Sequence, residues 1–238
     1  MKSGVKRTTP YKVISIIILV ILAILFLFPL YWIVTGAFKP TTDIYASQPV
    51  WWPSEWVTSN FEKLFTKRSA PLFEIGALVG PTVPAAIRWL VNTVFMSVAA
   101  MLLTCITAAM AGYALAKKRF VGRTLLFSLI ICAMALPKQV ILIPLLKEMS
   151  ALKLYGSLWA VIFPTVGWPF GVFLMKQFCE SVPGEMLEAA RIDGASEART
   201  FTQIVVPLIK PGIGALAIFT FINSWNDYFM QLVMLPNS

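Results

Sequence analysis

Histidine is absent from this chain of 238 residues, and charged residues make up only 13% of it. Without histidine, the chain has no imidazole for acid–base catalysis and no histidine ligand for a metal site. The phosphate-binding pattern Gly-x-x-x-x-Gly-Lys-Ser/Thr is also missing, so we do not expect the chain to bind ATP itself. The three cysteines lack the spacing of a metal site or of a disulfide framework: Cys105, Cys132 and Cys179. We therefore expect no metal, no cofactor and no enzymatic activity.

What the chain has is apolar sequence. Hydrophobic residues make up 58% of it, and its mean hydropathy is +0.77, which indicates an integral membrane protein. The first uncharged run has 26 residues, or about 39 Å as a helix. It can therefore cross a hydrocarbon core of roughly 30 Å with tilt, and it is too long for a signal peptide. Five runs are long enough to be spans: 13–38, 89–116, 124–146, 154–175 and 211–234.

Three of these runs contain residues that disturb a membrane helix. The run 124–146 includes Lys138, Pro137 and Pro144, and each proline is expected to kink or end a helix. The run 154–175 is rich in glycine and proline, which neighbouring helices can accommodate. The run 211–234 is interrupted by Asp227.

The net charge of +9 would also suit nucleic acid, but the basic residues gather at the ends of the apolar runs. The N-terminus and the connections 117–123 and 176–210 hold twelve Lys and Arg; the other side holds eight. Because basic residues favour the cytoplasmic side, we expect a cytoplasmic segment 1–12 and a transmembrane domain 13–238. The segment 39–88 is then an external loop. Three of its aromatic residues either anchor it at the membrane surface or contact a partner: Trp51, Trp52 and Trp56.

The connection 176–210 is more structured than a tether. Five of the eleven carboxylates of the chain lie between positions 180 and 197. Pro183 suits the start of a helix, Gly194 suits its left-handed end, and Ser196 can cap a second helix. That second helix has apolar residues at three- and four-residue spacing: Ala198, Phe201, Ile204, Val205 and Leu208. We expect two short helices joined by a glycine turn and facing the aqueous phase.

Within this connection, Glu188-Ala189-Ala190, Asp193-Gly194-Ala195 and Ile204-Val205-Val206-Pro207 resemble the EAA loop of ABC-importer membrane subunits. Valine replaces the usual leucine before the proline. Three further runs resemble carbohydrate-type permeases related to the maltose system: Gly36-Ala37-Phe38-Lys39, Ala111-Gly112-Tyr113-Ala114 and Asn223-Ser224-Trp225-Asn226-Asp227. Together the matches cover most of residues 11 to 235.

The resemblance implies an all-α polytopic membrane helical bundle with the type I importer permease fold. Such permeases usually have six core helices, so with five spans we expect a form that lacks its last helix. It also implies a subunit that passes carbohydrate across the cytoplasmic membrane. Its partners would be a second permease subunit, giving a heterodimer, two ATP-binding subunits that hydrolyse ATP, and an extracytoplasmic solute-binding protein. The residues expected to couple to the ATPase are Glu188, Ala189, Ala190, Asp193, Gly194, Ala195, Ile204 and Pro207. The alternative is an amphipathic loop that lies on the membrane surface.

A second group of candidates lies in the last apolar run. An ionisable residue inside a span costs on the order of 2.5–3.5 kcal/mol at mid-membrane, so it usually faces partners or a water-filled path. Asn223, Trp225, Asn226 and Asp227 therefore either line the translocation pathway or form structural polar packing. In the pathway, amides and Asp227 would bond sugar hydroxyls and Trp225 would stack on a sugar face. We interpret Lys138 as an interfacial lysine whose charge reaches the membrane surface.

Other classes of protein fit less well. A secondary transporter or channel would have no use for the EAA-like loop. An intramembrane enzyme would need histidines, paired carboxylates or a nucleophile arrangement that the sequence does not show. Importer permeases for amino acids, phosphonates and peptides also have EAA-type loops, and here the Trp225-Asn226-Asp227 match favours carbohydrate.

Overall fold

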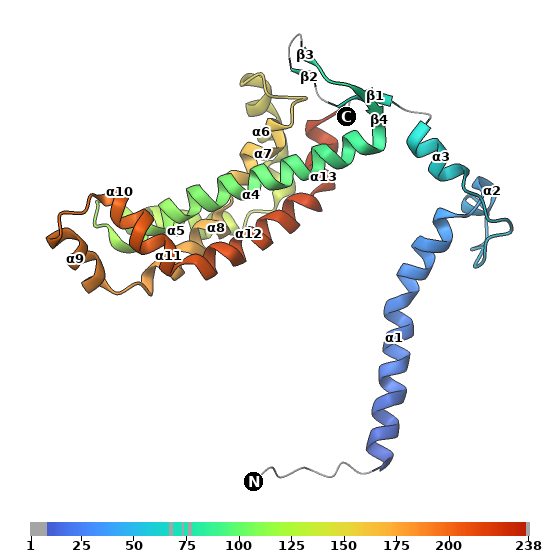
Figure 1. Cartoon of the computed structure of the whole chain (residues 1–238), viewed down its shortest axis with the longest axis horizontal. Helices are drawn as coiled ribbons and strands as arrows, with labels where there is room; N and C mark the ends of the chain where they lie inside the picture. Colours follow the sequence, from blue (N-terminus) through green and yellow to red (C-terminus); the bar gives the residue numbers. More distant parts are fainter. Residues whose placement is uncertain (1–8, 67–68, 73, 76–77, 237–238) are drawn as a thin grey trace. The chain divides into compact units, whose positions relative to one another are not determined.

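The computed structural model describes residues 9–66, 69–72, 74–75 and 78–236. The chain forms two compact units, Met1–Arg88 and Trp89–Ser238, and helices dominate both (Figure 1). Among the described residues, three helices are long and apolar enough to cross a membrane. Two bent helix pairs raise this number to as many as five. A helical membrane protein is confirmed.

The first unit begins with α1 (Thr9–Ala37), which is apolar on every side. None of its most hydrophobic window is buried inside the protein, as expected for a helix whose side chains face lipid. Pro29 lies inside α1 without ending it. A helix long and apolar enough to cross a membrane therefore lies where the first span was predicted, while most of the predicted N-terminal segment 1–12 lies outside the described residues.

The segment that follows α1 has short helices and strands. It contains α2 (Thr41–Ile44) and α3 (Ser59–Thr66). Two antiparallel strand pairs follow, β1 (Ser69–Pro71) with β4 (Thr82–Pro84) and β2 (Glu74–Ile75) with β3 (Leu78–Val79). The all-α prediction missed these strands, because two or three residues are too few to show an alternating pattern.

The start of this segment is tied to the end of α1. Lys39 is buried; its ammonium donates to the carbonyl of Val50 at 2.5 Å and lies 4.0 Å from the centre of the Trp32 ring. The amide of Asn60 donates to the carbonyls of Ala37 and Lys39. The run Gly36-Ala37-Phe38-Lys39, which resembles carbohydrate-type permeases, therefore holds the loop after α1 in place through its last residues.

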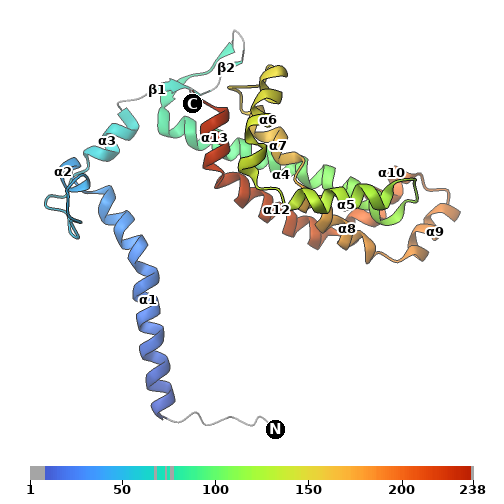
Figure 2. The same cartoon turned by 180° about the vertical axis from the view of Figure 1, so that it is seen from behind.

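The second unit consists of helices and one π-helical turn. In chain order these are α4 (Ala85–Lys117, with its first residues in the first unit), α5 (Arg123–Met134), α6 (Lys138–Ala151), α7 (Trp159–Val166), α8 (Pro169–Glu180), α9 (Gly184–Ile192), α10 (Glu197–Thr200), η1 (Phe201–Val205), α11 (Val206–Leu208), α12 (Lys210–Trp225) and α13 (Tyr228–Met234). The views of Figure 1 and Figure 2 both place α8 beside α12.

Two glycines allow close approach to α8. A Cβ at Gly112 of α4 would lie 2.7 Å from the backbone nitrogen of Lys176, and a Cβ at Gly212 of α12 would lie 2.4 Å from the Phe178 ring. Small residues at helix contacts are typical of membrane bundles, where packing takes the place of the hydrophobic effect. The core has two clusters. One includes Cys105, Ala108, Met175, Cys179 and Leu216, and the other includes Met96, Ala100, Met149, Ile162 and Met234.

Three of the predicted spans are not continuous helices. The run 154–175 is divided at Gly167 and Trp168 into α7 and α8, which together are long enough to cross a membrane. The run 124–146 bends by 109° between α5 and α6, where Pro137 precedes the first turn of α6, whereas Pro144 lies inside α6 without ending it. The run 211–234 breaks after Trp225, and Asp227 precedes α13. The interruption of this run at Asp227 is therefore a break between two helices: the Asp227 carboxylate accepts from the backbone N–H of Met230 and starts a new helix.

Candidate functional site

The connection 176–210 forms the predicted pair of helices joined by a glycine turn. α9 ends at Ile192 with Asp193 as its C-cap, and Gly194 has a φ of +73°, which a residue with a Cβ rarely adopts. The backbone N–H of Ala195 donates to the carbonyl of Ala190 at 2.9 Å and closes the end of α9. The hydroxyl of Ser196 accepts from the backbone N–H of Arg199 at 3.3 Å and caps α10, as the sequence predicted.

The exposed side of α9 differs in one respect from the prediction. Glu188 and Ala189 are exposed, but Ala190 is only 5% exposed and faces the bundle. The outward apolar residues are instead Met186, Ala189 and Ile192, which follow a three-residue spacing; Ile192 is 86% exposed. α9 therefore presents a narrow, exposed apolar stripe on the surface of the second unit.

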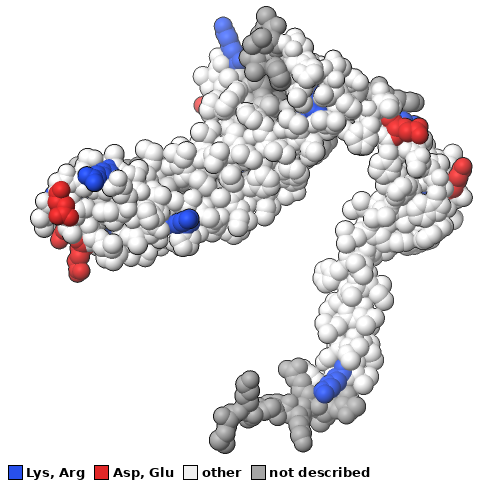
Figure 3. Space-filling view, viewed as in Figure 1, with Lys and Arg blue, Asp and Glu red and all other residues white. Residues whose placement is uncertain are grey.

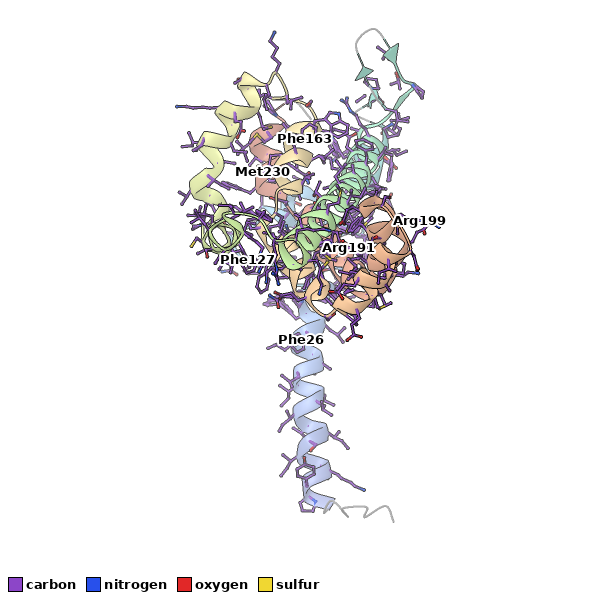
Figure 4. All side chains as sticks on the ribbon, turned by 90° about the vertical axis from the view of Figure 1, so that its left-hand side faces the viewer. Phe26, Phe127, Phe163, Arg191, Arg199 and Met230 are labelled. Carbon is purple, nitrogen blue, oxygen red and sulfur yellow. The ribbon has the colours of Figure 1, made fainter. Side chains whose placement is uncertain are left out.

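Two exposed carboxylates lie beside this stripe. Glu185 and Glu188 form no ion pair within the residues that the structure describes. Charged atoms of both signs gather at this end of the second unit, where α9 and α10 lie (Figure 3). Figure 4 looks onto the same end and shows Arg199 pointing away from the helices. An apolar stripe beside unpaired carboxylates suits a partner with an apolar cleft and a basic group.

The remaining predicted coupling residues lie around this turn and behind it. Asp193 is exposed, Ala195 is partly buried, and Pro207 is exposed in α11. Ile204 is partly buried in η1, next to the fully buried Val205. Proline has no N–H to donate to the preceding helical turn, and the wide π-helical turn immediately before Pro207 lies where that bond is missing.

Sequence reasoning missed a cluster around Glu197. Its carboxylate forms an ion pair with Lys118, accepts from the Tyr113 hydroxyl at 3.2 Å and lies 3.5 Å from the guanidinium of Arg191. The hydrogen bond from Lys118 holds the pKa of Glu197 below its usual value. Glu197 therefore connects α10 to α9 and to the end of α4. The basic run 117–119 and the run Ala111-Gly112-Tyr113-Ala114 were visible in the sequence, but nothing there paired them with position 197.

A second polar cluster lies at the break between α12 and α13. The ammonium of Lys138 lies 3.2 Å from a carboxylate oxygen of Asp227 and 3.3 Å from the amide oxygen of Asn223. Lys138 is therefore paired across the fold and is not simply an interfacial lysine. These groups line a concavity of about 450 Å³ together with Trp168, Phe219, Ile222 and Asn226.

Three of the four predicted pathway residues thus come together, and one does not. Asn223, Asn226 and Asp227 line the concavity. Trp225 lies outside it and stacks on Phe221, with ring centres 5.6 Å apart. The aromatic residues in the concavity are Trp168 and Phe219, which no sequence motif indicated. No group of three or more carboxylates or cysteines within the described residues could hold a metal ion.

The sequence of the chain is similar to those of known transport proteins. Residues 106–238 match the family described as binding-protein-dependent transport system inner membrane component. The chain belongs to this family. The arabinooligosaccharides transport system permease protein AraQ of Halalkalibacterium halodurans is 32% identical over 91% of this chain and 73% of its own length. The diacetylchitobiose uptake system permease protein NgcG of Streptomyces coelicolor is 28% identical over 94% of this chain and 69% of its own length.

The fold has a counterpart among solved structures. A chain of a bacterial ABC transporter involved in the import of the acidic polysaccharide alginate superposes with a TM-score of 0.71. The match covers 99% of this chain and 78% of the other, at 23% identity. The resemblance to ABC-importer permeases and the predicted fold class are confirmed.

Proposed function

We propose that this chain is the transmembrane permease subunit of an ATP-driven, binding-protein-dependent importer for sugars. Family membership supports the role of an inner membrane transport component. The names of related permeases that cover most of the chain support the substrate class, since they transport arabinooligosaccharides and diacetylchitobiose. As a membrane component it works with separate subunits that hydrolyse ATP, with a second permease chain and with an extracytoplasmic solute-binding protein.

The coupling role rests on one observation: α9 presents exposed apolar residues beside carboxylates that have no partner in the described chain. Glu188 pairs with a basic group of an ATPase subunit, while Ala189 and Ile192 fill an apolar cleft. Gly194 sets the angle between α9 and α10. The N-terminus and the connections on the same side as this segment hold twelve Lys and Arg residues. This distribution favours a cytoplasmic position for the segment, and ATP is available in the cytoplasm. The N-terminus lies on the same side, and 39–88 lies outside.

The concavity at the α12–α13 break is the proposed place of contact with sugar. Asn223 and Asn226 offer amide donors and acceptors for hydroxyls, and Trp168 and Phe219 offer aromatic surface. Lys138 and Asp227 neutralise each other, so the site has no excess charge that would require an ionised substrate. Uncharged oligosaccharides fit this balance of groups.

The coupling role is tested with Glu188→Lys and Gly194→Asp in the assembled transporter. Glu188→Lys reverses the charge offered to the partner, and Gly194→Asp forces a side chain into a backbone conformation that disfavours it. We expect both variants to enter the membrane, to lose co-purification of the ATPase subunit and to lose sugar uptake. Glu148→Lys is the matched control, because it reverses an exposed carboxylate of α6, away from this segment. Unimpaired association and uptake in both test variants would contradict the docking role.

A further inference from the structure

Two lysines contact the coupling segment on both sides of α9: Lys117, the last residue of α4, and Lys118, which follows it. Lys117 donates to the carbonyls of Glu180 at 3.1 Å and Val182 at 2.6 Å, just before α9. The next residue, Lys118, pairs with Glu197, just after α9. Two consecutive lysines therefore connect one membrane helix to the entry and to the exit of the segment that is proposed to dock.

Glu197 is the point where three elements meet. Its carboxylate contacts Lys118 and Tyr113 at the end of α4, Arg191 on α9, and its own backbone lies at the start of α10. The Tyr113 ring also packs on Phe201, with ring centres 5.3 Å apart. A carboxylate that contacts two other helices favours one relative position of them. Moving α4 lengthens its contacts with Lys118 and Tyr113, and moving α9 lengthens the ion pair with Arg191.

The contrast with Glu188 separates two tasks. Glu188 is exposed without an ion pair in the described chain and is available to another subunit, whereas the charge of Glu197 is engaged internally. Removing the Glu197 charge leaves the outer face of α9 unchanged: Met186, Ala189 and Ile192 remain exposed and Glu188 keeps its charge.

We propose that Glu197 is a positioning residue that transmits the displacement of α9 to the membrane helix α4 through Arg191 and Lys118. This rests on the proposed coupling function of α9. When an ATPase subunit moves α9, the Arg191–Glu197–Lys118 chain pulls the end of α4 in the same step. Without the carboxylate, α9 still docks, but its movement is less completely converted into movement of the transmembrane helices.

The test compares Glu197→Gln with the unchanged protein in the complete transporter reconstituted in liposomes. Because exposed ion pairs contribute little free energy, we expect uptake per ATP hydrolysed to fall by about two- to fivefold. Co-purification of the ATPase subunit should stay unchanged. Glu180→Gln is the matched control: it removes an ion pair of similar geometry, Lys176–Glu180 at 2.6 Å, that lies within one helix and joins no two elements. Its uptake per ATP should stay unchanged.

A charge exchange separates transmission from a general structural role. Lys118→Glu and Glu197→Lys should each lower uptake per ATP, and the double variant should recover part of the loss, because the pair is restored with its signs reversed. Unchanged uptake per ATP in Glu197→Gln would overturn the proposal, as would loss of ATPase co-purification in that variant, which would place Glu197 in the docking surface. If α9 does not dock on an ATPase subunit at all, a different result is expected: Glu188→Lys will show normal association and normal uptake.

Discussion

Two lysine–carboxylate pairs join distant parts of the second unit, and they lie in opposite surroundings. At the α9–α10 end, Glu197 is 59% exposed and Lys118 is 29% exposed. At the α12–α13 break, Asp227 is 15% exposed and Lys138 is 49% exposed, among apolar helices. The carboxylate is the exposed partner in the first pair and the shielded one in the second.

The largest difference is expected on removing the shielded carboxylate. Asp227→Ala removes the carboxylate partner of Lys138 and the cap of α13, so we expect a loss of about 1–2 kcal/mol in stability. Sugar uptake should also fall, because Asn223 and Lys138 lose their fixed positions. Thermal unfolding in detergent and uptake kinetics measure the two effects. Unchanged uptake affinity and rate would remove Asp227 from the pathway.

A smaller effect on stability is expected at the exposed pair. Glu197→Gln should lower stability by less than about 1 kcal/mol, since exposed ion pairs contribute little. Its effect on uptake per ATP should nevertheless be clear. The same unfolding measurement, made beside that for Asp227→Ala, checks the order of the two stability effects. A greater loss of stability in Glu197→Gln would contradict the comparison.

Raising the salt concentration should affect the two ion pairs to different extents. Mobile ions screen exposed charges more than shielded ones, so the coupling energy between Lys118 and Glu197 should fall between about 0.05 M and 0.5 M salt, by less than about 0.5 kcal/mol. The coupling energy between Lys138 and Asp227 should change less. Double-mutant cycles measured at both salt concentrations give the two values. An equal salt dependence would show that the surroundings of the two pairs do not differ as described.

The smallest effect is expected from pH. Lys118 lowers the pKa of Glu197 below the usual value of about 4.3, so the carboxylate is fully charged at neutral pH. Its contribution is present above the unfolded pKa and is lost only as pH falls through the lower folded pKa. Lys118, Arg191 and Tyr113 face it, and none of these residue types ordinarily titrates near neutrality. The ratio of uptake per ATP between Glu197→Gln and unchanged protein should therefore be flat from about pH 6 to 8. A clear slope would mean that another titrating group controls the connection between α9 and α4.

The sequence predicted features that depend on local chemistry. Gly194 and Ser196 fixed the turn and the cap of the coupling segment because their preferences act within three or four residues. The apolar runs indicated the membrane helices because burial in lipid requires long uncharged stretches. What the sequence did not predict depends on contacts between distant residues: Lys138 with Asp227, and Lys118 with Glu197. Asp227 marked the interruption of the last apolar run, but the sequence did not show that its carboxylate caps a new helix, because the residues on both sides of it are apolar.

The central claim is that α9 faces the cytoplasm and is covered by an ATPase subunit. The most direct test places a single cysteine at the exposed Ile192, with Cys105, Cys132 and Cys179 replaced by alanine. A membrane-impermeant maleimide is then applied to inside-out and right-side-out vesicles. We predict labelling of Ile192→Cys only in inside-out vesicles, and protection from labelling when the ATPase subunits are bound. Labelling from the outer side, or equal labelling with and without the ATPase subunits, would contradict the account.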